Sequence, residues 1–165
     1  MVILGIDPGF AIVGWGVLEC VNGQFRVMGY GSIQTKAGLT TEDRINQIFD
    51  GLNTIIEKYK PDVMAIEELF WNTNQKTGIA VAEARGVLLL AAYRKGLQIF
   101  EYTPLQVKQA VVGYGRAEKR QVIMMVTSIL KLAKPPKPDD TADALALAIC
   151  HGHVGCSTLG KYYKM

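Results

Sequence analysis

Apolar and polar residues alternate along the chain in an order that predicts an α/β fold. The opening run, Val2-Ile3-Leu4-Gly5-Ile6-Asp7, is apolar and bounded by Pro8-Gly9, which is typical of a buried strand. Residues 12–20 and 25–33 are strand-like as well, and Asn22-Gly23 between them predicts a tight hairpin. Three consecutive strands with short connections predict an antiparallel meander.

A helix and a second buried strand follow the meander. Apolar residues recur at helical spacing from Ile45 to Tyr59, after a capping threonine at position 40 or 41. The strand Val63-Met64-Ala65-Ile66 comes next and ends in Glu67-Glu68. A helical crossover predicts that this strand runs parallel to its sheet neighbour. If that neighbour is the first strand, Asp7 and Glu67 emerge at one sheet edge, where ligands of open α/β sheets usually bind.

The rest of the chain is predicted to be mainly helical. Helices are expected over residues 74–95, from Thr103-Pro104 to Gly113, over about 118–132, and from Asp139 or Asp140 through Ile149. One further short strand is expected over residues 97–102. We expect a single domain over residues 1–155 and a flexible tail over residues 156–165.

The amino-acid composition is typical of a globular protein. The chain has 165 residues, of which 49% are hydrophobic and 20% charged, as in one ordinary globular domain. No apolar run reaches transmembrane length, and the N-terminus lacks a basic flank and a cleavage site. We therefore expect a cytoplasmic protein without a membrane partner.

Basic residues are concentrated in one segment. From Thr103 to Lys137 there are seven bases and one acid. Lys108, Arg116, Lys119 and Arg120 belong to it, and we expect them to contact the phosphates of a polyanion. The alternative is a solvated basic face without a partner.

Four carboxylates stand in apolar surroundings. Asp140 and Asp143 are three residues apart and share a helix face, and Asp143 lies in a run of Ala, Leu and Ile that predicts burial. Asp7 and Glu67 end buried strands. Together these acids would repel one another, so they predict a divalent cation, with oxygen ligands that favour Mg²⁺ or Mn²⁺ over Zn²⁺. The alternatives are that Asp7 shapes a turn and that Asp140 caps a helix.

Five motifs occur in order along nearly the whole chain. They are Gly5-Ile6-Asp7-Pro8-Gly9, Ala65-Ile66-Glu67, Gln106-Val107-Lys108-Gln109-Ala110-Val111-Val112-Gly113, Ala117-Glu118-Lys119 and Asp140-Thr141-Ala142-Asp143-Ala144-Leu145-Ala146. Together they resemble the RuvC family of Holliday-junction resolvases. The resemblance implies a ribonuclease H-like fold, with a mixed five-stranded sheet flanked by helices.

The resemblance also implies functional roles for single residues. Asp7, Glu67, Asp140 and Asp143 match the metal-binding catalytic acids, which hold Mg²⁺ or Mn²⁺, two ions per site by our expectation. Lys108 and Lys119 match basic residues that serve DNA binding or catalysis. Phe70 matches an aromatic residue near the centre of the junction.

The implied activity is metal-dependent cleavage of four-way DNA junctions by two symmetric nicks. The implied partners are a second copy of the chain and a branch-migration motor. A C2 dimer suits a junction of near two-fold symmetry, and the apolar helix over residues 74–95 is the expected contact surface. Two other functions stay open at this stage: a ribonuclease of the same fold, and a junction-binding scaffold that does not cut.

Overall fold

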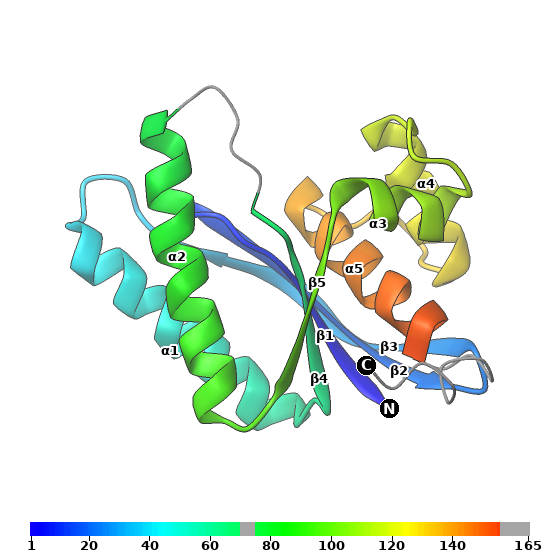
Figure 1. Ribbon diagram of the computed structural model, residues 1–165, viewed down its shortest axis with the longest axis horizontal. Helices are drawn as coiled ribbons and strands as arrows, with labels where there is room; N and C mark the ends of the chain where they lie inside the picture. The colour runs from blue at the N-terminus through cyan, green and yellow to red at the C-terminus, as the bar shows by residue number, and fades with distance from the viewer. Residues whose placement is uncertain (70–74, 156–165) are drawn as a thin grey trace.

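One five-stranded mixed sheet runs through the computed structural model, which describes residues 1–69 and 75–155 (Figure 1). The side chains of residues 75–77 and the predicted tail over residues 156–165 lie outside that description. The strand order is β3-β2-β1-β4-β5. The strands are β1 (Val2–Asp7), β2 (Ile12–Val21), β3 (Gln24–Gln34), β4 (Val63–Glu67) and β5 (Gln98–Tyr102).

The strand directions agree with the sequence pattern. β1, β2 and β3 form the predicted antiparallel meander, and Asn22 and Gly23 turn the β2–β3 hairpin with φ values of 51° and 77°. β4 pairs in parallel with β1 and also with β5, and Ile6 lies opposite Ile66. The carboxyl ends of β1 and β4 therefore lie side by side, as predicted.

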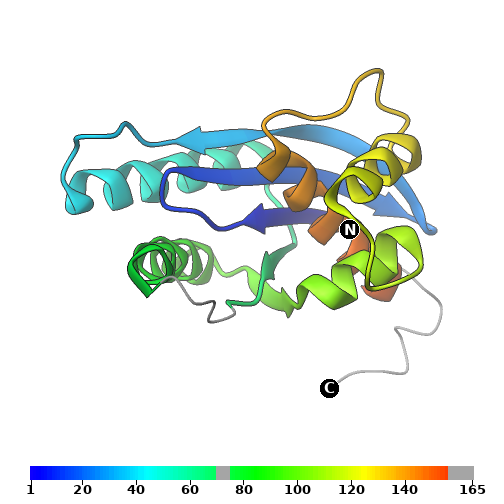
Figure 2. The ribbon, with the colours of Figure 1, turned by 90° about the horizontal axis from the view of Figure 1, so that it is seen from above.

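Helices cover both faces of this sheet (Figures 1 and 2). One layer contains α1 and α2, and the other contains α3, α4 and α5. Their bounds are α1 (Thr41–Tyr59), α2 (Gln75–Arg94), α3 (Pro104–Val112), α4 (Lys119–Ile129) and α5 (Asp139–Gly155). Within residues 1–69 and 75–155, none of these helices has the length and apolar character needed to span a membrane.

α4 ends three residues earlier than predicted. Lys131 has a φ of 51°, which leaves the helical region, and the N–H of Leu132 bonds to the carbonyl of Thr127. The apolar pattern continues past this point because Leu130 still packs into the core. The apolar periodicity therefore predicts a helix that is too long, because Leu130 stays buried where the backbone leaves the helical conformation.

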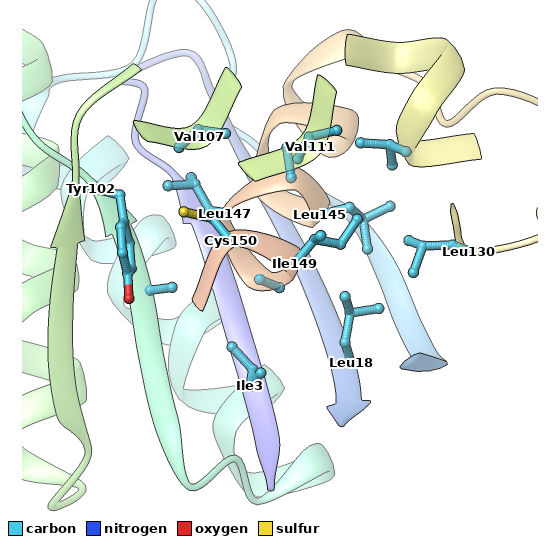
Figure 3. Packing of buried hydrophobic residues seen from close by; sticks show 14 of the residues in the cluster. Ile3, Leu18, Tyr102, Val107, Val111, Leu130, Leu145, Leu147, Ile149 and Cys150 are labelled. Atoms are coloured by element: carbon cyan, nitrogen blue, oxygen red, sulfur yellow. The ribbon is translucent and has the colours of Figure 1, made fainter. Parts of the chain in front are cut away.

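Two separate cores follow from the alternation of side chains along the strands. Leu4 and Ile6 of β1 pack against α1 and α2, whereas Ile3 faces α5. Figure 3 shows Leu145 and Ile149 of α5 packed over the sheet on this second side. By the same alternation, Asp7 and Glu67 belong to the face that α5 covers.

Glycines on β1 and β2 let α5 lie directly on the sheet. A Cβ atom at Gly5 would overlap the carbonyl oxygen of Ala144, and one at Gly14 would overlap that of Asp140. Ala144 is itself fully buried. Gly14 pairs with Asp7 across the β1–β2 ladder, so this close approach brings the start of α5 to the end of β1.

Replacing Gly14 by alanine is expected to destabilise the protein. The added methyl group must displace helix backbone and not a flexible side chain, and overpacking of this kind costs about 1–3 kcal/mol or more. The measurement is the free energy of unfolding in urea.

Gly86→Ala is the matched control, because Gly86 lies on an exposed part of α2 with no atom near the added Cβ. It is expected to stabilise the protein by about 0.5–1 kcal/mol. Equal effects at the two positions would contradict the close packing of α5.

Candidate active site

Four acids meet at one edge of the sheet. Asp7 is the last residue of β1 and Glu67 the last residue of β4, while Asp140 and Asp143 lie in the first turns of α5. Asp7 and Glu67 line one hollow together, and Glu67 and Asp143 line another. Acids that are far apart in the sequence are thus brought to one place, as predicted.

Burial and the nearby negative charges make Asp7, Glu67 and Asp143 hard to ionise. Burial raises the pKa of Asp7 to about 8, and the charges of Asp143, Glu67 and Asp140 act in the same direction. Burial also raises the pKa of Glu67 and of Asp143, each against the opposing effect of Lys119. The edge therefore carries more carboxylate groups than it can hold in ionised form without positive charge.

Lys119 supplies part of that positive charge. Its Nζ atom lies 2.9 Å from Oδ2 of Asp143. Burial acts to lower the pKa of Lys119, but the hydrogen bond and the attraction to Asp143 outweigh it and leave the pKa raised. Lys119 is the first residue of α4, where a cation opposes the helix dipole. In the structure the carboxylate of Asp143 is a partner that compensates this placement, and the phosphate contact expected from the sequence stays a prediction.

A pocket joins the acids to the basic segment. Lys108 of α3 lines it together with Lys119, Glu67 and Asp143, and the charge of Lys108 acts to lower the pKa of Glu67. The remaining lining is apolar and consists of Pro104, Val107, Val122 and Leu147. Both lysines from the sequence motifs are thus within reach of the acids.

The donor set fits a hard divalent cation. It consists of carboxylate oxygens, which suit Mg²⁺ or Mn²⁺, and its excess of negative charge is what such an ion would neutralise. Across residues 1–69 and 75–155, however, no three acidic, His or Cys side chains stand close enough together to enclose an ion. The acids therefore converge on one edge without forming a closed set of ligands in the part of the chain that the structure describes.

Two other predicted residues do not join this group. Arg116 and Arg120 are exposed, and neither lines the pocket. Phe70 lies outside the described residues. Glu68, the neighbour of Glu67, is exposed; it lines the hollow shared by Asp7 and Glu67 but not the pocket shared by Glu67 and Asp143.

Two supporting residues were missed by the sequence analysis. Thr141 is fully buried, and its hydroxyl donates to the carbonyl of Gly31 at 3.1 Å, which ties the start of α5 to β3. Arg85 of α2 donates to the carbonyl of Glu67 at 3.2 Å. The available signal for Arg85 was an isolated base inside the apolar helix pattern.

Comparison with known proteins gives consistent matches over nearly the whole chain. The family model for crossover junction endodeoxyribonuclease RuvC matches residues 3–151. The RuvC proteins of Alkaliphilus oremlandii and Halothermothrix orenii are 56% and 57% identical to this chain, over 94% and 93% of each sequence.

Solved structures give the same result. Thermus thermophilus RuvC superimposes with a TM-score of 0.86 at 33% identity, over 94% of this chain and 95% of that one. T. thermophilus RuvC in complex with a Holliday junction substrate matches with a TM-score of 0.86 at 34% identity, over 92% of each chain. The predicted ribonuclease H-like α/β class is therefore confirmed.

The raised pKa of Asp7 predicts how stability depends on pH without metal. Between the ordinary pKa of 3.8 and the folded value of about 8, the unfolded chain loses a proton that the folded chain keeps, so stability falls as pH rises through this window. Asp7→Asn removes this loss. At pH 8 the variant is expected to be more stable than the parent by at least about 1.4 kcal/mol, the equivalent of one pKa unit.

Urea unfolding of the parent protein and Asp7→Asn at pH 4 and pH 8, with a chelator present, checks this expectation. The difference between their free energies of unfolding should disappear at pH 4. Glu68→Gln, which changes an exposed neighbouring acid, is the control. A less stable Asp7→Asn protein at pH 8 would instead show that the carboxylate shapes the Pro8-Gly9 turn.

Proposed function

The chain belongs to the RuvC family of crossover junction endodeoxyribonucleases, and from this membership we propose how its described residues resolve a DNA junction. The protein is a structure-selective endodeoxyribonuclease that acts on four-way (Holliday) junctions. The observation that carries the proposed site is the convergence of Asp7, Glu67, Asp140 and Asp143 on one edge, where burial and the neighbouring charges together raise the pKa of Asp7 to about 8.

The four acids are the proposed metal ligands. Nucleases of this family depend on a metal, and we propose Mg²⁺, with Mn²⁺ as a substitute and two ions per site. When bound, such ions supply Lewis acidity for the attack of water on a phosphodiester. The chain itself contributes carboxylates that converge on one sheet edge, and we propose that the cations draw them into a closed set of ligands.

The two lysines balance the charge of this site. Lys119 contacts Asp143, and Lys108 lies in the same pocket near Glu67. We propose that they draw the scissile phosphate toward the acids, which on their own would repel it. Arg116, Arg120 and Phe70 stay predicted DNA contacts.

Neither alternative function has a specific observation in its favour. RuvC relatives match over nearly the whole chain, which supports junction cleavage over the processing of RNA. A scaffold that only bound phosphates would gain from losing the acids at the DNA surface. Their retention beside two lysines therefore favours a site built for chemistry.

We also propose that the protein acts as a homodimer through α2. Leu90 and Tyr93 of this helix are 51% and 76% exposed, and a hollow between α1 and α2 is lined by apolar side chains that include Phe49 and Val87. A two-fold pair of sites suits the two equivalent strands of an open junction. Association with a branch-migration motor stays a prediction from the family resemblance.

Asp7→Asn is expected to abolish cleavage while it keeps junction binding. The substitution removes a ligand charge that the chemistry needs, but it also removes repulsion toward phosphate, a gain that should be larger above pH 8, where Asp7 is ionised. A synthetic four-way junction with Mg²⁺ measures nicks, and gel-shift titration measures affinity.

Paired symmetric nicks by the parent protein are the expected positive result. Binding without nicks would instead support the scaffold, and a preference for an RNA strand would support the ribonuclease. Loss of both binding and cleavage in Asp7→Asn would make Asp7 a structural residue.

Lys119→Ala is expected to weaken junction binding and to reduce its salt dependence. Removing one phosphate contact lowers the slope of log K against log salt concentration by about 0.9. The control is Lys58→Ala, since Lys58 lies on α1, on the opposite face of the sheet. An unchanged slope for Lys119→Ala would restrict this lysine to its contact with Asp143.

A further inference from the structure

Arg85 reaches from α2 to the end of the catalytic strand β4. Only 13% of its side chain is exposed, although the residue is charged. Its Nε atom donates to the carbonyl oxygen of Glu67 at 3.2 Å, and its Nη2 atom lies 2.6 Å from Oε2 of Glu101 on β5. A single guanidinium therefore links a helix of one layer to two neighbouring strands.

Arg85 contacts the peptide group that joins Glu67 to Glu68. The N–H of that group, which belongs to Glu68, donates to the carbonyl of Tyr102 at 2.9 Å. Its carbonyl oxygen accepts from Arg85. Both polar atoms of the peptide are thus held, one by β5 and one by α2.

The hydrogen bond from Arg85 lies where the pairing between β1 and β4 has already ended. The paired residues of β1 and β4 end at Ile6 and Ile66, one residue before Glu67. Because the orientation of a peptide plane determines where the adjoining side chain points, fixing this peptide also directs the Glu67 carboxylate.

An arginine suits this position better than other bases do. Its planar fork donates from two nitrogen atoms in fixed relative directions, here to a carbonyl and to a carboxylate. Glu101, whose side chain is 49% exposed, compensates the largely buried charge. The ion pair therefore offsets part of the desolvation cost of Arg85 and keeps its side chain in one geometry.

We propose that Arg85 is a positioning residue that holds the Glu67 carboxylate in the orientation needed to receive the metal, with Glu101 orienting Arg85. The inference rests on the proposed function, since it assumes that Glu67 is a metal ligand. Arg85 touches neither the substrate nor the reacting atoms and acts only through the backbone of β4.

The test compares Arg85→Gln with the parent protein in two measurements. Binding of Mn²⁺ without DNA, followed by electron paramagnetic resonance of the free ion, is expected to weaken by roughly 10–100-fold, as for residues that orient metal ligands elsewhere. The Mn²⁺ concentration for half-maximal junction cleavage should rise by the same factor. Junction affinity without metal should stay within about twofold of the parent value, because no phosphate contact is lost.

Two further variants keep the test decisive. Glu101→Gln removes the partner of Arg85 without altering β4, and it should weaken Mn²⁺ binding in the same direction even if Arg85→Gln folds poorly. Lys95→Gln is the matched control, because it breaks an exposed ion pair with Glu57 just beyond the end of α2. It should leave Mn²⁺ binding and cleavage unchanged.

The inference is overturned if Arg85→Gln and Glu101→Gln lower the unfolding midpoint but bind Mn²⁺ like the parent protein. That result differs from a failure of the proposed function, in which the parent protein itself would neither bind Mn²⁺ nor cut the junction. Glu67→Gln supplies the reference for complete loss of this ligand.

Discussion

The crowding of four carboxylates at one partly buried edge is the constraint on which the arrangement of this molecule depends. Burial raises the pKa of Asp7 to about 8, with the charges of Asp143, Glu67 and Asp140 acting in the same direction, so the folded chain keeps these acids together at an energetic cost. Two parallel strands bring Asp7 and Glu67 to one edge, and α5 brings Asp140 and Asp143 by lying against strand glycines. Lysines placed beside the acids reduce this cost, and a bound cation would reduce it further.

The two helical layers contribute to this edge in different ways. α3, α4 and α5 supply the groups that face the pocket, with Lys108, Lys119 and Asp143 among them. α1 and α2 lie on the opposite face and act on the backbone instead. Arg44 of α1 stacks over the ring of Phe10 with its guanidinium 4.0 Å from the centroid, next to the loop that follows Asp7, while Arg85 of α2 holds the carbonyl of Glu67. One layer thus supplies the charged groups of the pocket, and the other contacts the backbone at the ends of the strands that carry Asp7 and Glu67.

Much of this could be read from the sequence, because the relevant signals are local. A short apolar run identified β4 and placed Glu67 at its end, and an apolar helix around Asp143 indicated a buried acid in need of a partner. The remainder depends on contacts between distant segments. No local sequence pattern indicates that Lys119 contacts Asp143, and none indicates that Arg85 contacts the carbonyl of Glu67. The end of α4 was missed since burial of Leu130 continues where the backbone no longer follows a helix.

The direct seating of α5 on the sheet also limits how such a protein can diversify. Gly5 and Gly14 leave no room for even one methyl group beneath the helix, and Ala144, whose carbonyl oxygen faces Gly5, is fully buried. Any larger residue at either glycine would push back the helix that carries Asp140 and Asp143. A redesign of this protein that is meant to keep the four acids in place must therefore leave both glycines unchanged and make its substitutions elsewhere, for example on the exposed surface of α2.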